Sequence, residues 1–261
     1  MSWWHVLLLA VVQGVTEFLP ISSSGHLVVL EHVLPGGKEL RSPTLNVFLH
    51  LGTLLAILWA YRREVAALLV RNRRLGGLIL LGTLPGVVLG AGLRLAVPEL
   101  LTCPGITGGM LLVSGALLWW MPRAAPGQRD LEGLGPAGAC WIGCAQAAAL
   151  LPGLSRSGTT IAAALALGLK RPQAATFSFL LALPITLGAV VLELIEISRL
   201  SSPGLSWWHL ALGVVVSFFA GLLALGWLLR LLASGRIGLL AWWCFLLGGG
   251  VLVGWGTSCW K

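Results

Sequence analysis

Long runs of hydrophobic residues alternate with short polar segments along this 261-residue chain. A helix that crosses the hydrocarbon core of a bilayer needs about 20 mostly apolar residues. Six segments approach or exceed that length: Thr44–Tyr61, Leu75–Val97, Pro104–Met121, Gln173–Ser198, Ser206–Leu232 and Ile237–Trp255. The pattern therefore predicts an all-α polytopic membrane protein with six spanning helices.

Two further hydrophobic regions are each split by a short polar stretch. His5–Leu19 and His26–Leu34 flank PISSSG, and Pro136–Leu151 and Thr159–Leu169 flank PGLSRSG. None of these four pieces is long enough to cross a bilayer alone. Irregular backbone at membrane depth is tolerated only where it is buried in protein or lines a wet cavity. We therefore expect two re-entrant helical hairpins, whose second helices begin at His26 and Thr159.

The two broken regions are related by a weak internal repeat. A shift of 133 positions superimposes four pairs of residues: Gln13 on Gln146, Ser22 on Ser155, Ser24 on Ser157, and Gly25 on Gly158. Each half, about 1–121 and about 136–258, then holds one hairpin and three spanning helices within a single membrane domain, 1–261. Because three is odd, the second copy is inverted relative to the first, as in many transporters.

The distribution of basic residues predicts the orientation in the membrane. Five arginines crowd the loop 62–74, which the positive-inside rule places in the cytoplasm. Alternation then adds six basic residues on the same side: Arg123, Arg129, Lys170, Arg171, Arg230 and Arg236. The opposite side receives only five: Lys38, Arg41, Arg94, Arg199 and Lys261. The first hairpin then enters from outside and the second from the cytoplasm.

Composition excludes a soluble protein. Hydrophobic residues make up 57% of the chain and charged residues 10%, against roughly 25% charged residues in an average soluble domain. The net charge of +8 reflects membrane topology, because excess Lys and Arg orients membrane proteins. Since no basic segment is interleaved with aromatic residues in a polar context, we expect no nucleic-acid partner.

The two polar breaks carry ionisable residues that are costly inside a membrane. Glu17, His26 and Arg156 each cost about 3 kcal/mol at the bilayer centre unless they are paired or hydrated. If the two hairpins meet tip to tip, these costs offset one another. A pairing of Glu17 with Arg156 that merely clamps the hairpins would leave seven clustered hydroxyls unexplained: Ser22, Ser23, Ser24, Ser155, Ser157, Thr159 and Thr160.

This combination of groups suits a phosphate. Helix N-termini present free N–H groups and a positive dipole end to an anion, and arginine binds phosphate oxygens bidentately. A histidine beside a serine hydroxyl can act as base or acid in phosphoryl transfer. Glu17 would either orient His26 or hold a divalent metal together with phosphate oxygens.

TEFLPISSSGHL and PGLSRSGTT together resemble the signature loops of the bacterial undecaprenyl-pyrophosphate phosphatase family, also named bacitracin-resistance proteins. The resemblance extends to LHLGTLLAIL and FSFLLALP and covers nearly the whole chain. It implies removal of the terminal phosphate from undecaprenyl pyrophosphate, which recycles the carrier lipid for cell-wall synthesis. It also implies a bacterial inner-membrane protein whose site opens to the outer face.

The resemblance assigns roles to individual residues. Ser23 matches the nucleophile, His26 its proton-transfer partner, Arg156 the phosphate-binding arginine, and Glu17 the second carboxylate of a Glu-x-x-x-Glu pattern. Ser22, Ser155 and Thr160 match hydroxyls that line the phosphate, and we expect their neighbours Ser24 and Ser157 to join them.

Two positions depart from the family pattern. Gln13 stands where the first carboxylate is expected, and an amide supplies neither charge nor a proton acceptor. Asn46 replaces an acidic residue, and His50 follows one helical turn later. We interpret Gln13 and Asn46 as residues that support the site without touching the phosphate. His50 either shares that role or packs in the core.

The sequence thus predicts a phosphatase acting on a polyprenyl pyrophosphate within the bilayer. Either Ser23 attacks the phosphorus and His26 takes its proton, or a water activated by His26 or Glu17 attacks directly. A divalent cation, Mg or Ca, is expected, because the pyrophosphate carries more charge than one arginine neutralises. The alternative is a transporter that flips polyprenyl phosphate with the same pocket. The oligomeric state is open, with a homodimer as one option.

Overall fold

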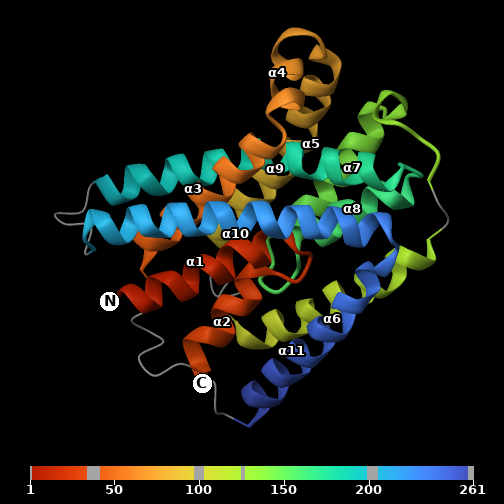
Figure 1. Ribbon diagram of the computed structural model, residues 1–261. Coiled ribbons are helices and arrows are strands. Elements are labelled where there is room, and N and C mark those ends of the chain that lie inside the picture. Colours follow the sequence, from red (N-terminus) through yellow and green to blue (C-terminus); the bar gives the residue numbers. More distant parts are fainter. Residues whose placement is uncertain (1, 34–41, 97–102, 125–126, 199–204, 258–261) are drawn as a thin grey trace.

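The computed structural model describes residues 2–33, 42–96, 103–124, 127–198 and 205–257, and within these ranges the chain is built from helices (Figure 1). Six helices are long and apolar enough to cross a membrane: α3 (Pro43–Ala60), α5 (Arg73–Ala96), α6 (Pro104–Trp120), α9 (Arg171–Ser198), α10 (Trp207–Ala233) and α11 (Leu239–Gly256). Each overlaps one of the six predicted spans, so the prediction of a multi-pass all-helical protein is confirmed.

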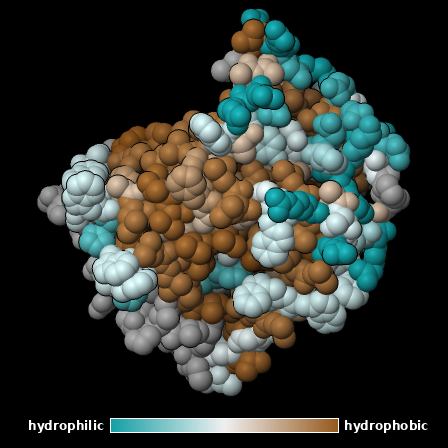
Figure 2. All heavy atoms as spheres, in the orientation of Figure 1, coloured by the Kyte–Doolittle hydropathy of each residue, from teal (hydrophilic) through white to brown (hydrophobic). Residues whose placement is uncertain are grey.

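The surface agrees with a membrane environment. Figure 2 shows a broad hydrophobic area over the long helices, with hydrophilic residues gathered at the margins. Leu80, Leu223 and Leu246 are at least 65% exposed on three of the spanning helices. Water would penalise so much exposed hydrocarbon, whereas lipid does not.

Both predicted breaks are present. Helix α1 (Trp3–Phe18) is separated from α2 (Ser23–Val33), and α7 (Pro136–Ala148) from α8 (Arg156–Ala166). The second helices begin three residues before the expected starts, His26 and Thr159, and those two starts were wrong. Each of these helices begins earlier than expected because a serine hydroxyl caps its N-terminus.

The two breaks have matching local structures. The hydroxyl of Ser155 caps α8 by accepting a hydrogen bond from the Gly158 N–H at 3.2 Å, and the hydroxyl of Ser22 accepts one from the Gly25 N–H at 3.2 Å. Ser22 adopts the left-handed conformation with φ 68°, which few non-glycine residues do. The same cap therefore forms at positions 133 residues apart.

Helices of one half of the chain pack against helices of the other half. Helix α1 packs along α10, and α7 packs along α5, while α6 lies along α11. Glycines permit the closest approaches: a Cβ at Gly52 would lie 2.0 Å from Oγ of Ser217 on α10. Figure 1 shows α9 and α10 running side by side and α3 crossing them obliquely, with both helix breaks at the middle of the molecule.

The loops predicted to share one side are joined by direct contacts. Arg74 donates hydrogen bonds to the carbonyls of Glu132 and Leu134, at 2.9 and 2.6 Å. Lys170 forms an ion pair with Asp130 at 2.7 Å. These contacts connect the loops 62–74, 121–136 and 170–172.

The fourth predicted loop, 230–236, is linked to the loop 170–172 in the same way, because Arg171 donates a hydrogen bond to the Leu232 carbonyl at 3.3 Å. Part of the first loop is itself a short helix, α4 (Arg62–Val70), which the hydrophobic pattern had not revealed. Four basic residues assigned to the opposite side lie outside the described residues: Lys38, Arg41, Arg199 and Lys261.

Candidate active site

The two helix breaks meet. The Gly153 N–H, in the second break, donates a hydrogen bond to the Ser24 hydroxyl of the first break at 3.2 Å. Ser114 of α6 braces the second break from behind, because its hydroxyl donates to the Gly153 carbonyl and accepts from the Ser155 N–H, at 3.0 and 2.9 Å. Segments about 130 residues apart thereby form a single polar centre.

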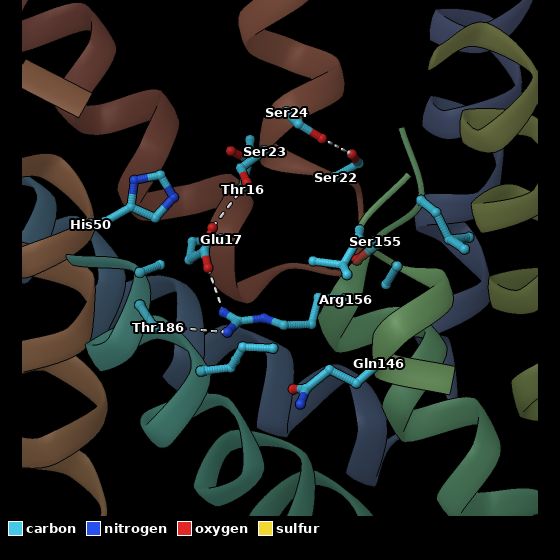
Figure 3. A pocket seen from close by; sticks show the side chains of 15 residues that line it. Thr16, Glu17, Ser22, Ser23, Ser24, His50, Gln146, Ser155, Arg156 and Thr186 are labelled. Carbon is cyan, nitrogen blue, oxygen red and sulfur yellow. Dashed lines mark hydrogen bonds and ion pairs between the residues drawn. The ribbon is translucent and has the colours of Figure 1, made fainter. Parts of the chain in front are cut away.

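A cavity of about 270 Å³ opens at this junction. Its polar lining comes from both breaks and from two spanning helices: Thr16, Glu17, Ser22, Ser23, Ser24, His50, Gln146, Ser155, Arg156 and Thr186. Apolar residues complete the wall. Figure 3 shows the labelled side chains gathered around one space, with Glu17 between Ser23 and Arg156.

Glu17 is the centre of the hydrogen-bond network. One carboxylate oxygen forms an ion pair with Arg156, and the other accepts a hydrogen bond from the Ser23 hydroxyl at 2.9 Å. The Gln13 amide also donates to the second oxygen at 3.2 Å. Arg156 in turn donates to the Thr186 hydroxyl at 2.6 Å. The arrangement places a serine hydroxyl, a carboxylate and a guanidinium group around one cavity.

Two predicted phosphate contacts lie behind the cavity wall. The Ser157 hydroxyl lies 3.3 Å from that of Ser155, and the Thr160 hydroxyl lies 2.6 Å from that of Ser178. Both residues are almost completely buried, and neither lines the cavity. In this structure they support the break around Arg156, and a phosphate contact by them stays a prediction.

The ring of His26 is held between the Ser22 carbonyl and Trp243. Its Nδ1 donates to the Ser22 carbonyl at 2.7 Å, and its Nε2 accepts a hydrogen bond from the indole of Trp243 on α11 at 2.7 Å. Both ring nitrogens are therefore engaged, and His26 is not part of the cavity lining. Its role as the proton-transfer partner of Ser23 stays a prediction.

Three polar residues of the site were missed by sequence reasoning: Thr16, Gln146 and Thr186. Thr186 was overlooked because a threonine after a proline in a spanning helix has no distinctive signal. Gln146 aligns with Gln13 in the repeat but was given no role. Its side chain is 1% exposed, and among the described residues its amide atoms have no hydrogen-bond partner.

His50, for which the sequence left either a role beside the site or core packing open, also lines the cavity. Its Nδ1 lies 2.9 Å from the backbone carbonyl of Asn46. Asn46 is thus linked to the site through its backbone, and its side chain is not part of the cavity lining.

Comparison with known proteins identifies the family of the chain. The model of the family described as bacitracin resistance protein BacA matches residues 6–250. The chain belongs to the BacA family.

Relatives within the BacA family are similar over almost their full length. A protein of Rhodopirellula baltica named undecaprenyl-diphosphatase is 44% identical over 245 residues, which cover 94% of this chain and 95% of that protein. Proteins of the same name from Alcanivorax borkumensis and Desulfatibacillum aliphaticivorans are 42% and 38% identical. These matches cover 92% and 97% of this chain, and 93% and 99% of the relatives.

Proposed function

We propose that this BacA-family chain hydrolyses undecaprenyl diphosphate to undecaprenyl phosphate and inorganic phosphate, and so recycles the lipid carrier of cell-wall synthesis. The observation that carries this proposal is the contact of Glu17 with both Ser23 and Arg156 in a cavity of a membrane protein. The names of the relatives supply the substrate.

The geometry suggests how the first step proceeds. Arg156 exchanges its partner Glu17 for the oxygens of the pyrophosphate, which it can bind bidentately. The N-terminus of α8, which begins at Arg156, adds N–H donors and a positive dipole end.

Ser23 Oγ then attacks the terminal phosphorus. The new O–P bond forms as the bond to the bridging oxygen breaks, and the lipid monophosphate leaves. The proton of Ser23 passes to Glu17 at 2.9 Å, so Glu17 is the base of this proposal. Water then hydrolyses the phosphoserine and regenerates the enzyme.

We also propose a membrane arrangement for the site. The two helix pairs are re-entrant hairpins of an inverted repeat, 1–121 and 136–258. The shared serine caps and the exchanged packing of α1 with α10 and α7 with α5 support this arrangement. The breaks would lie near mid-membrane, where backbone irregularity requires protein or water around it.

Opening of the site to the outer face has separate support. A smaller cavity of about 50 Å³ shares His50, Thr186 and Ala189 with the main cavity and continues to Glu193. It therefore extends toward the end of α9 at Ser198, away from the basic loop at Arg171. If the arginine-rich loops are cytoplasmic, this direction is outward.

The lining residues do not form a dedicated metal site. Among the described residues, no group of three or more His, Cys, Asp or Glu is placed to hold a metal ion. Glu17 is engaged by Arg156, Ser23 and Gln13. We propose that a Mg or Ca ion arrives bound to the pyrophosphate and supplies charge neutralisation. A role of Glu17 as its ligand stays a prediction.

Phosphate release from undecaprenyl diphosphate by the purified protein tests the function. Ser23→Ala should lower kcat by about 100-fold or more while lipid binding persists. Arg156→Ala should weaken binding of any phosphorylated lipid. Wild-type protein that binds the lipid pyrophosphate and releases no phosphate with Mg or Ca would instead favour a transporter. Full hydrolysis by Ser23→Ala would keep the phosphatase and make water the attacking group.

A further inference from the structure

The proposed two-step reaction requires two proton acceptors at different times. The first accepts the proton of Ser23 when the phosphoserine forms, and Glu17 lies in contact for this step. The second accepts a proton from the water that hydrolyses the phosphoserine. Since Glu17 holds the first proton, and needs it to protonate Ser23 Oγ as the phosphate leaves, a different group must serve the water.

His50 meets the geometric requirements for the second acceptor. A backbone carbonyl can only accept, so the 2.9 Å contact with the Asn46 carbonyl fixes the hydrogen on Nδ1 of His50. Nε2 is then the nitrogen that carries the lone pair. Within the part of the chain that the structure describes, no hydrogen-bond partner engages Nε2.

The position of the ring supports the same role. His50 lines the main cavity together with Glu17, Ser23 and Arg156, and also the smaller cavity that continues toward Glu193. Figure 3 shows its ring extending from α3 toward the side chains of Glu17 and Ser23. His50 thus stands between the reacting groups and the space through which water would enter.

His26, the other imidazole near the breaks, lacks these properties. Its Nδ1 donates to the Ser22 carbonyl, and its Nε2 is occupied by the indole N–H of Trp243. The main cavity is lined by His50 and not by His26.

We propose that His50 is a catalytic residue, the general base of the dephosphorylation half-reaction; this rests on the phosphatase function proposed above. The water oxygen bonds to phosphorus while the Ser23 Oγ–P bond breaks. The proton of the water goes to Nε2 of His50, and Glu17 returns its proton to Ser23 Oγ. The protonated imidazole then loses its proton to solvent as hydrogen phosphate departs.

Single-turnover and steady-state kinetics of the full chain with undecaprenyl diphosphate test the assignment. His50→Gln keeps a polar side chain but removes the base. It should release about one equivalent of lipid monophosphate per chain in a burst, followed by turnover about 100-fold slower than wild type, with acid-trapped phosphoserine accumulating. The matched control is His5→Gln, on α1 outside the cavity, which should behave as wild type.

Chemical rescue separates a base from a structural residue. Added imidazole should restore turnover of His50→Ala, whereas pyrazole, a much weaker base of the same shape, should not. Equal rescue by both compounds, or normal turnover by His50→Gln without a burst, would overturn the inference while leaving the phosphatase intact. A wild-type protein without phosphate release would instead overturn the proposed function itself.

Discussion

Arg156 forms an ion pair across the two helix breaks with Glu17, which lies 139 residues away in the sequence. The pair neutralises two charges that would each be costly within a bilayer. It also keeps the arginine beside the cavity. In the mechanism proposed above, an incoming pyrophosphate would compete with the carboxylate for this arginine, so the same residue would first clamp the two breaks and then bind phosphate.

Glu17→Gln should abolish most of the activity. The amide keeps the shape of the side chain but cannot accept the proton of Ser23, so kcat should fall by about 100-fold or more. KM should change less, because Arg156 is freed from its ion pair and stays available to phosphate. The measurement is phosphate release under steady-state conditions.

Glu132→Gln is the matched control for this prediction. It makes the same chemical change in the short helix Leu131–Gly133, away from the cavity. It should leave kcat unchanged. Near-normal turnover by Glu17→Gln would exclude Glu17 as the base.

Thr186→Val tests how Arg156 is held. The substitution preserves side-chain volume and removes the hydroxyl that accepts from Arg156 at 2.6 Å. Loss of one hydrogen bond to a charged group is worth about 1.5–3 kcal/mol, so KM or Kd for the lipid should rise by roughly 10-fold or more. Thr83→Val, where the hydroxyl bonds only within α5, is the control. A change in kcat alone would contradict a role in orienting the arginine.

Sequence patterns were sufficient for the spans and the breaks, because both follow from runs of apolar residues and their interruption. They were also sufficient to place Glu17 with Arg156, since burying two charges demands a partner. Sequence patterns could not predict that the His26 side chain contacts α11. Helix α2 begins at Ser23 because the hydroxyl of Ser22 accepts the N–H of Gly25, and this start turns His26 toward α11.

The sequence also could not predict that Thr186 and His50 line the cavity, and the reason is related. They depend on how α3 and α9 rotate against each other, and a helix that is hydrophobic on all sides gives no periodicity from which to infer its inner face.

Gln13→Glu should strengthen the dependence on a divalent cation. Gln13 is fully buried and its amide lies 3.2 Å from Glu17, so the substitution sets two carboxylates side by side. Such a pair favours binding of Mg through one or two carboxylates together with substrate phosphates. The Mg concentration that gives half-maximal phosphate release should fall relative to wild type. An unchanged titration would show that position 13 has no access to the cation.

Gly52→Ala should destabilise the fold without touching the cavity. An added Cβ would lie 2.0 Å from the Ser217 hydroxyl and 2.5 Å from the Val214 carbonyl, so α3 and α10 must move apart. Overpacking of this kind costs about 1–3 kcal/mol. The midpoint of thermal unfolding in detergent should fall, whereas Gly77→Ala, with no neighbour within 4 Å of its Cβ, should not lower it. An unchanged midpoint for Gly52→Ala would contradict the close packing of these helices.

His26 can act either by transferring a proton or by holding the turn at Ser22, and two substitutions separate these roles. Asparagine can place an amide N–H near the position of Nδ1 and so preserve the bond to the Ser22 carbonyl, whereas alanine cannot. Because Nε2 is occupied by Trp243, we expect His26→Asn to retain at least about 10-fold more activity than His26→Ala, the scale of one hydrogen bond to a constrained turn. Trp243→Phe, which removes only the indole donor, should cost no more than His26→Asn. Equal and severe losses in both His26 variants would show instead that His26 carries a proton in the reaction, as the family resemblance implies.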